Sequence, residues 1–299
     1  MRCLQSILQQ TYKHVEVIIS DDSPDEDIKH AIEPYINKLP LFYYHNKPSL
    51  KSPRNWNNAL DLAKGDFMLL LHQDDWFHDV NALELFLQAF EKDPKTDFVF
   101  CQNTAIDEGG KKYILQARPQ LLPKLSQKPN HLLLAQVIGP PSNTMLRRSV
   151  NVRYDEQFIW LVDVDYYSRI LKEGYHYQYI PKHLVSIGLH GDQTTVFCRT
   201  NDDIILKENI LFAHKLETTA FNDMLIYDYY WRLLRNYKIR KLEDLFPSGI
   251  TERNVPCVIK SMLHFQSKFS LNLLSKGVLS KSLMAWSYSL WRLKAGKNK

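Results

Sequence analysis

The sequence predicts an α/β fold, with a mainly parallel sheet flanked by helices and a helical region after it. Over the first two thirds of the chain, short apolar runs alternate with helical patterns, and this order is typical of layered α/β proteins. Polar or turn-forming residues end the apolar runs. After about Asp202 the strand-like runs stop, and only helical patterns remain.

The predicted strands are apolar runs at residues 15–20, 41–46, 66–73 and 97–107, and "GGKKYI" after the last one indicates a hairpin. Helical patterns lie between them, at residues 31–39, 52–65 and 81–94. In the second of these patterns we place Ser52 as the N-cap, Pro53 at the first helical position and Gly65 just past the end.

The last third of the chain has helical patterns at residues 204–237, 255–277 and 279–299, with a linker-like segment at residues 241–256. The final pattern is aromatic and basic, and no acidic residue follows Glu252. Such a helix can lie on an anionic membrane surface or pack on the protein as a solvated terminal helix, and both interpretations stay open. Its aromatic and basic residues are Trp286, Trp291, Arg292, Lys294, Lys297 and Lys299.

Composition limits the class of protein. The 299 residues are 44% hydrophobic with a formal charge of +5, which allows a large core and gives no indication of nucleic-acid binding. The four cysteines form no CxxC pair, so a zinc ribbon or a redox motif is disfavoured and a reducing compartment is favoured. No apolar run approaches the roughly 20 residues that span a bilayer, and no signal-peptide core is present. We therefore predict a cytoplasmic protein.

Polar side chains follow three of the predicted strands where each strand ends: Asp22, Asn46 and Asp74. Because α/β sheets bind ligands beyond the carboxyl ends of their strands, we expect these side chains in one crevice. The adjacent acids Asp74 and Asp75 suit Mg²⁺ or Mn²⁺ with a phosphorylated ligand. The alternative is that they form a cap or a solvated turn before the helix at Asn81.

Five segments occur in a specific order: "SILQQTYKHVEVIISDDS", "RNWNNALDLAKGDFMLLLHQDDW", "GPPSNTMLRRS", "VDVDYYSRILKEGY" and "IPKHLVSIGLHGDQTT". Together they resemble a family 2 glycosyltransferase, a family with the GT-A fold. The resemblance covers roughly Arg2 to Thr195. It implies a GT-A glycosyltransferase domain at residues 1–200 and a helical region at residues 201–299.

The resemblance implies a set of donor-binding residues. Asp22 matches the acid that contacts the nucleotide base, and Asn46, Arg54 and Asn55 match the region that lines the nucleotide. Asp75 matches the acid that commonly stands beside the metal-binding acid.

The resemblance also implies a divalent metal, Mn²⁺ or Mg²⁺, on Asp74. The first acid of the D-x-D motif is His72 in this chain, which departs from the family pattern. His190 matches a histidine that reaches the metal or the diphosphate, although a lone histidine can equally be structural. A zinc cluster of His72, His78 and Asp79 is disfavoured because the spacing matches no common zinc pattern.

Asp163 matches the acid that serves as general base in inverting members of the family. An acceptor hydroxyl is too weakly acidic to attack unaided, and a carboxylate within hydrogen-bond reach removes its proton. From the residues alone, Asp163 and Asp165 could each cap the helix that begins there or interact with its positive end.

The resemblance therefore implies an inverting glycosyltransferase that moves a sugar from a nucleotide sugar to a hydroxyl of a glycan or lipid-linked glycan in cell-surface polysaccharide biosynthesis. UDP is the expected nucleotide, with GDP and dTDP open. A second hypothesis is a catalytically inactive remnant that binds nucleotide or sugar. A third is a nucleotidyltransferase, which is weakened because no glycine-rich phosphate loop occurs near the N-terminus.

Members of the family begin with a strand that reads roughly "SVIIPTYN", before the helix matched here by "RCLQSILQQ". We expect this strand to be missing, which would leave ladder groups unpaired and part of the core uncovered. Two explanations stay open: an upstream start of the natural protein, and a truncated chain that is unstable or inactive. The first predicts that a form extended by about 15 residues, enough for one strand and its turns, unfolds at a higher temperature.

Overall fold

The structure is a computed structural model that describes residues 1–115 and 118–297. Lys299, part of the basic tail, lies outside the described residues. The chain divides into two compact units, Met1–Leu132 with Gln136–Gln193, and Leu133–Ala135 with Thr194–Lys299.

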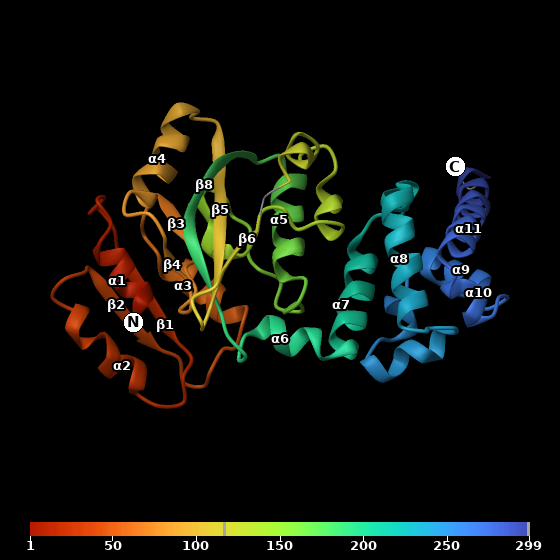
Figure 1. The fold of residues 1–299 in the computed structure, drawn as a ribbon, viewed down its shortest axis with the longest axis horizontal. Coiled ribbons are helices and arrows are strands. Elements are labelled where there is room, and N and C mark those ends of the chain that lie inside the picture. The colour runs from red at the N-terminus through yellow and green to blue at the C-terminus, as the bar shows by residue number, and fades with distance from the viewer. Residues whose placement is uncertain (116–117, 298–299) are drawn as a thin grey trace. The chain divides into compact units, whose positions relative to one another are not determined.

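The first unit alternates helices and strands along most of its length (Figure 1). Its elements are α1 (Arg2–Leu8), β1 (Val17–Asp21), α2 (Asp27–Ile32), β2 (Leu41–His45), α3 (Arg54–Leu62), β3 (Phe67–Leu69), β4 (Trp76–Phe77), α4 (Ala82–Lys92), β5 (Thr96–Asp107), β6 (Lys112–Leu115), β7 (Thr144–Arg147), α5 (Val162–Lys172) and β8 (His176–Leu189). Short 3-10 turns occupy Glu33–Tyr35, Pro119–Lys124, Pro129–Leu133 and Pro141–Asn143.

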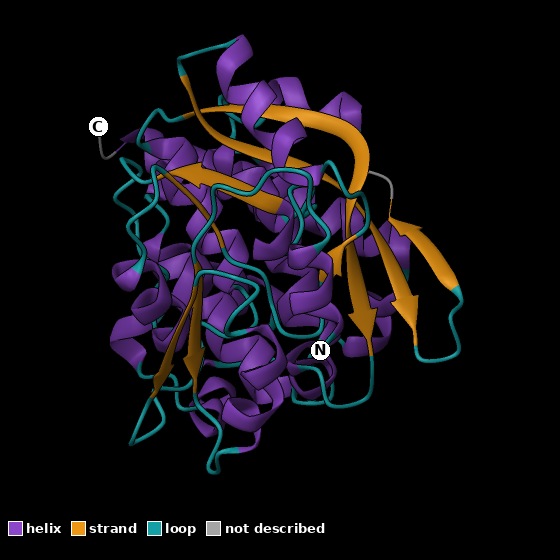
Figure 2. Ribbon diagram, turned by 90° about the vertical axis from the view of Figure 1, so that its left-hand side faces the viewer, coloured by secondary structure: helices purple, strands orange, loops and turns teal. Residues whose placement is uncertain are grey.

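The strands form two separate sheets. β1 and β2 pair in parallel, and the second sheet has the order β3-β7-β5-β8-β4 with β6 added to β5. Figure 2 shows paired strands lying apart from the remaining strands. β6 continues the chain from β5 as the predicted hairpin.

The expected predominance of parallel pairing is wrong for the second sheet. β3, β5 and β8 run in one direction, but β7 lies between β3 and β5 in the opposite direction, and β4 and β6 are also antiparallel to their neighbours. Four of the five pairings described in this sheet are therefore antiparallel, and the sheet is mixed. The sequence does not reveal β7, because its four residues carry too little periodic pattern to identify a strand.

Helices cover both faces of β5, as the alternation of side chains along a strand requires. Val99 packs with Phe86 and Phe90 of α4 in one apolar cluster. Phe98 points to the other face, where its ring stacks on Tyr167 of α5 with 6.4 Å between centroids. Figure 1 shows α4 and α5 on either side of this strand.

The predicted ends of α3 are wrong. Pro53 rather than Ser52 is the N-cap, and the helix ends at Leu62, before Gly65. The carboxylate of Glu16 accepts hydrogen bonds from the backbone N–H groups of Lys64 and Gly65. A contact from a segment distant in the sequence therefore holds the turn after α3.

The second unit is helical, as expected. Its helices are α6 (Thr194–Arg199), α7 (Asp202–Lys215), α8 (Met224–Asn236), α9 (Cys257–Gln266), α10 (Leu271–Ser275) and α11 (Gly277–Lys297), with 3-10 turns at Thr218–Asn222, Leu242–Ser248 and Glu252–Asn254. The side chains of Asn201, Asp223 and Ser270 cap the starts of α7, α8 and α10. None of the helices in the described ranges combines the length and the hydropathy of a membrane-spanning segment.

Candidate functional site

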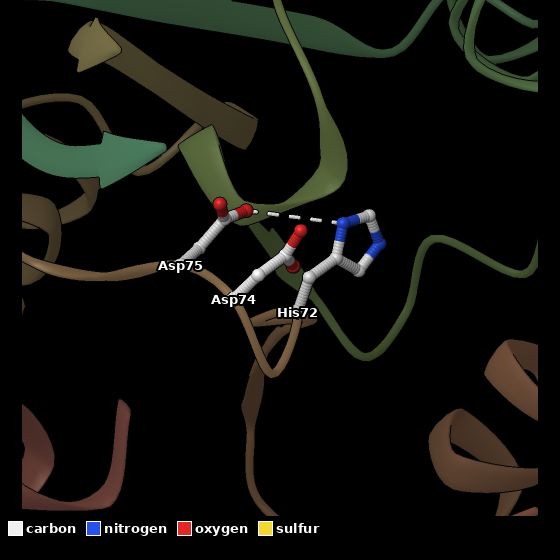
Figure 3. Close-up of side chains that lie close together, drawn as sticks. All are labelled: His72, Asp74 and Asp75. Carbon is white, nitrogen blue, oxygen red and sulfur yellow. Dashed lines mark ion pairs between the residues drawn. The ribbon is translucent and has the colours of Figure 1, made fainter. Parts of the chain in front are cut away.

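A cluster of three side chains lies in the turn between β3 and β4. His72, Asp74 and Asp75 each offer a ligand atom, and these atoms all lie within 4.8 Å of one another. Figure 3 shows the two carboxylates and the imidazole gathered at this turn, with the His72 ring facing the Asp75 carboxylate. The His72 Nδ1 atom is 3.8 Å from Asp75 Oδ2. The apolar run of β3 thus ends in a turn that brings two acids and a histidine together.

Asp75 is held inside the protein by two donors. Its side chain is 2% exposed, the Ser142 hydroxyl donates to Oδ2 at 2.5 Å, and the Gly188 N–H donates to Oδ1 at 3.2 Å. Ser142 also accepts a hydrogen bond from the His72 N–H at 3.1 Å, so one hydroxyl positions two members of the cluster. Burial raises the pKa of Asp75 to about 7.

Asp74 is oriented by residues that follow β8. His190 Nε2 lies 3.1 Å from Asp74 Oδ2, and the Gln193 amide donates to the same oxygen at 3.2 Å and to the Gly188 carbonyl at 2.7 Å. The structure therefore brings the predicted metal residues Asp74 and His190 together. A Cβ atom at Gly188 would lie 2.4 Å from the Asp74 carbonyl oxygen, so only glycine allows β8 to pass this close to the cluster.

The cluster fits a divalent cation. Two carboxylates supply hard oxygen ligands, which Mg²⁺ and Mn²⁺ prefer. Within the described residues, His72 Nε2 is buried and has no hydrogen-bond partner, and burial lowers the pKa of His72, which favours the neutral imidazole that binds metals. The residues that would hold the ion are His72, Asp74 and Asp75, so the departure at the first D-x-D position still supplies a ligand atom.

The alternative zinc cluster does not form in the described part of the chain. His78 Nδ1 lies 2.9 Å from the Ser186 hydroxyl. The Asp79 carboxylate accepts a hydrogen bond from the Asn81 N–H at 2.8 Å. Both side chains therefore have structural partners of their own.

Three of the predicted donor-binding residues form one polar network. The Asn46 side-chain amide donates toward Ser20 Oγ at 3.0 Å, Asp22 Oδ1 at 2.9 Å and Asn55 Oδ1 at 3.0 Å. The Asp22 carboxylate also accepts hydrogen bonds from the backbone N–H groups of Leu50 and Lys51. β1, the loop after β2 and the first turn of α3 therefore converge on one point.

Arg54 lies apart from this network. Its guanidinium pairs with the Glu156 carboxylate, with Nε 2.9 Å from Oε2, and its side chain is 60% exposed. Its neighbour Asn55 turns inward and donates to the Ser20 carbonyl at 3.0 Å, because successive residues of a helix point about 100° apart.

Aromatic side chains lie between the metal cluster and the polar network. The Trp56 ring lies 4.9 Å from the His72 ring and 5.2 Å from the Tyr154 ring, centroid to centroid. Ser20, Asn55, Trp56 and His72 line one cavity of about 680 Å³. One member of the metal cluster, His72, and two residues of the polar network, Ser20 and Asn55, therefore line the same cavity.

Asp163 stands in the first turn of α5. Its Oδ1 atom is buried and, within the described residues, has no hydrogen-bond partner, and burial raises its pKa to about 7. Burial raises the pKa of Tyr154 and Tyr167, and the nearby charge of Asp163 adds to the rise. Asp165 instead pairs with Arg169 at 2.8 Å. Asp163 therefore combines a raised pKa with a carboxylate oxygen that has no partner among the described residues, whereas Asp165 is ion-paired.

Sequence reasoning missed Ser142, Gly188 and Gln193. Each lies in one of the segments that carry the family resemblance, "GPPSN" and "IGLHGDQ". Their residue types are common in loops, so only their contacts with the Asp74 and Asp75 carboxylates reveal a role.

Comparison with known proteins shows the family and the fold of the chain. The family described as glycosyl transferase family 2 matches residues 1–154 of the 299. Escherichia coli chondroitin synthase is 26% identical over 198 residues, which are 66% of this chain and 28% of that protein. The chain therefore spans less than a third of the length of that relative.

Solved structures share the fold. TarS from S. aureus, residues 1–349 in complex with UDP, matches 98% of this chain and 87% of its own with a TM-score of 0.56 and 18% identity. The mannosyltransferase PcManGT from Pyrobaculum calidifontis, in complex with GDP-Man and Mn²⁺, matches 95% and 68% with a TM-score of 0.50 and 13% identity. These likenesses confirm the predicted GT-A fold. Because the family match covers more than half of its residues, the chain belongs to glycosyl transferase family 2 and is a glycosyltransferase.

Proposed function

We propose that the protein is an inverting, metal-assisted glycosyltransferase that moves a sugar from a UDP-sugar to a hydroxyl of a glycan or lipid-linked glycan. One observation supports this most: His72 of the metal cluster lines the same cavity as Ser20 and Asn55 of the polar network. A nucleotide sugar needs a site for its diphosphate beside a site for its nucleoside. The cluster suits the first and the network suits the second.

A divalent cation held by His72, Asp74 and Asp75 would neutralise the negative charge of the leaving diphosphate. The protein's own part is to orient the two carboxylates. Ser142 and the Gly188 N–H fix Asp75. In the same way, Gln193 fixes Asp74.

Asp163 is the proposed general base. Its pKa of about 7 lies near neutral pH, where a base is both largely ionised and strong enough to accept a proton. It would take the proton of the acceptor hydroxyl as that oxygen attacks the sugar. Inversion needs only this base and in-line geometry, with no covalent intermediate.

The finer assignments draw on related proteins. TarS is in complex with UDP, PcManGT is in complex with GDP-Man and Mn²⁺, and a relative is a chondroitin synthase. These properties belong to those proteins. For this chain they support a UDP-sugar donor, Mn²⁺ as the ion and a glycan acceptor as the hypotheses to test first.

The test is calorimetric titration of the protein with UDP, GDP and dTDP, each with and without Mn²⁺. We expect Mn²⁺-dependent binding of UDP that is lost in Asp74→Ala. Asp61→Ala is the matched control, because the Asp61 carboxylate pairs with Arg153 at the surface of the same unit. UDP binding that does not depend on Mn²⁺ and is unchanged in Asp74→Ala would contradict the proposal. Metal-dependent binding without any release of UDP from UDP-sugars would favour the inactive remnant.

We also propose that α11 makes peripheral contact with anionic membranes. Exposed apolar residues recur along one side of this helix, and no acidic residue occurs in its sequence, a pattern typical of helices that lie on such surfaces. Sedimentation with anionic and neutral vesicles tests this, and Leu293→Asp should weaken binding to the anionic ones. Equal sedimentation of both proteins would refute it. The residues on this side are Leu279, Trp286, Leu290 and Leu293; Val278 is also exposed but lies about 100° away around the helix.

A further inference from the structure

A cavity lies between α8 and the start of α11, within the second unit. Its volume is about 410 Å³. On α11 it is lined by Gly277, Ser280 and Lys281, which are three and four positions apart and therefore share one face of the helix. The facing wall is one face of α8, and it carries most of the charge.

Positive charge predominates around this cavity. Three of its lining residues are basic, Arg232, Arg235 and Lys281, and one is acidic, Asp228. Asp228 pairs with Arg232 at 2.9 Å, so these two charges neutralise each other. Within the described residues, neither Arg235 nor Lys281 forms an ion pair with a carboxylate. Two positive charges therefore remain for a ligand.

Ser280 has an unused hydrogen-bond donor. Its side chain is 1% exposed, and its Oγ accepts hydrogen bonds from Trp231 Nε1 and Arg235 Nη1, each at 3.1 Å. These bonds occupy both lone pairs of the hydroxyl, and the O–H has no acceptor among the described residues. Ser282 and Ser289 of the same helix instead donate to the carbonyl four residues earlier. Because a buried donor without an acceptor is unfavourable, the Ser280 O–H indicates an acceptor in the cavity.

The first turn of α11 adds further donors. Gly277 is the first residue of this 21-residue helix. The N–H groups of a first turn have no partner within the helix, and this end of a helix attracts negative charge. A Cβ atom at Gly277 would meet nothing within 4 Å, so the space beside the turn is open.

We propose that this cavity binds a phosphate monoester group. Such a group carries a charge of about −1.5 to −2 at neutral pH and three strong acceptor oxygens. The two remaining positive charges match that charge. The Arg235 guanidinium, the Lys281 ammonium and the Ser280 O–H supply donors of different types for the oxygens. The volume is that of a small-molecule site, so it also has room for the group that carries the phosphate.

A purely structural role explains less. As a link between two helices, the Trp231 and Arg235 hydrogen bonds to Ser280 need no ligand. That interpretation leaves the Ser280 proton without an acceptor and gives Lys281 no partner among the described residues. A carboxylate ligand would satisfy fewer donors, because it has two oxygens and a single charge.

The phosphate monoester can belong to a soluble molecule or to a phospholipid. Val278 and Leu279, in the same first turn of α11, are 82% and 44% exposed, and apolar side chains beside a basic pocket suit a lipid headgroup. A sugar phosphate offers the same group without acyl chains. The test has one arm for each source.

The soluble arm is calorimetric titration of the full chain with inorganic phosphate and with glucose 1-phosphate, in EDTA and without nucleotide. The lipid arm is sedimentation with phosphatidylcholine vesicles that contain phosphatidic acid, a monoester, or phosphatidylglycerol, a diester, at equal surface charge. Both arms use wild type, Arg235→Gln and Lys281→Gln. Lys268→Gln is the matched control, since Lys268 is an exposed lysine of the same unit that does not line the cavity.

We expect wild type to bind glucose 1-phosphate or to prefer phosphatidic acid. Arg235→Gln and Lys281→Gln should weaken that binding at least about tenfold, and Lys268→Gln should not change it. The Trp231 indole N–H signal in NMR, identified by its loss in Trp231→Phe, should shift on binding because this N–H bonds to Ser280. Binding in the soluble arm identifies a soluble ester, and binding in the lipid arm alone identifies a phospholipid.

Three results would overturn the proposal: no binding in either arm, binding that is equal in wild type and Lys281→Gln, and binding without a shift of the Trp231 signal. Lys281 is exposed, so its substitution keeps the test valid even if Arg235→Gln, which loses a bond to Ser280, fails to fold. No readout uses a nucleotide or a divalent metal, so failure here is distinct from failure of the proposed glycosyl transfer.

Discussion

Replacing Asp163 by Asn should slow catalysis strongly and stabilise the protein at the same time. Asn has nearly the same shape as Asp but cannot take a proton or carry a charge. The carboxylate of Asp163 is buried, and its pKa is raised to about 7 by that burial. The charged form is therefore present at neutral pH at the expense of stability, which is a common feature of catalytic groups.

The magnitude follows from the pKa. The folded state keeps the Asp163 proton up to about pH 7, whereas the unfolded chain releases it near pH 4. Between these values the folded state binds more protons, so this carboxyl lowers the free energy of unfolding as pH rises, and its full effect is present above pH 7. A shift of about 3 units corresponds to about 4 kcal/mol. That figure is an upper bound because the residue is only partly buried as a whole.

The assay is urea unfolding of both proteins at pH 5 and pH 8. Asp163→Asn should be more stable at pH 8, and its advantage should grow by about 2–3 kcal/mol between the two pH values. Its Mn²⁺-dependent release of UDP from a UDP-sugar should fall by about 10²–10⁴-fold, the range for a lost general base. The wild-type rate should rise with pH and level off above about 7.

Asp165→Asn is the matched control in the same helical turn. It breaks the buried ion pair with Arg169, so it should lower stability, the opposite sign. If the gain in unfolding free energy of Asp163→Asn does not change with pH, the claim that burial desolvates the Asp163 carboxylate is refuted. Retention of UDP release within about tenfold of wild type would refute the role of general base.

Three further predictions concern the metal cluster. Gly188→Ala should weaken Mn²⁺-dependent UDP binding at least about tenfold, because the new Cβ lies 2.4 Å from the Asp74 carbonyl. The control Gly191→Ala, whose Cβ meets nothing within 4 Å, should bind normally. Equal binding by the two variants would show that the turn accommodates the Cβ at position 188. Ser142→Ala should destabilise the protein by about 1–3 kcal/mol at pH 8. The effect should be smaller at pH 5, where Asp75, with a pKa of about 7, is protonated. A loss of unfolding free energy that is the same at both pH values in chemical unfolding would argue against the hydrogen bond to the carboxylate. Mn²⁺ at about 100 times its Kd should raise the Tm by about 5–10 °C, and EDTA should reverse the rise. A similar rise in Asp74→Ala would show that the ion binds elsewhere.

Much of the fold can be predicted from the sequence. The runs at β1, β2 and β5 and the amphipathic pattern of α4 predict their elements closely, because apolar periodicity reports which face is buried. β7 was not predicted, since four residues carry too little pattern. The antiparallel pairing of β7 depends on its position between β3 and β5, which is a property of distant segments.

Part of the candidate site was likewise predicted from the sequence, and part was not. Asp22, Asn46 and Asn55 were predicted from residue type and order, and the structure joins them by hydrogen bonds. Ser142 and Gln193 were not predicted, because their importance comes from what they touch. Arg54 was predicted from its place in a motif, and its side chain pairs with Glu156 outside the network; its role in donor binding stays a prediction.

The sequence by itself determined the family, the order of strands and helices, and the acids available for chemistry. These are local properties, because they depend only on the type of each residue and on its neighbours along the chain. Only the tertiary structure decided that His72 completes a cluster with Asp74 and Asp75, that Asp163 is desolvated while Asp165 is paired, and that a cavity separates β1 from β3. Burial, charge pairing and strand pairing each depend on which distant segments meet, and no local pattern contains that information.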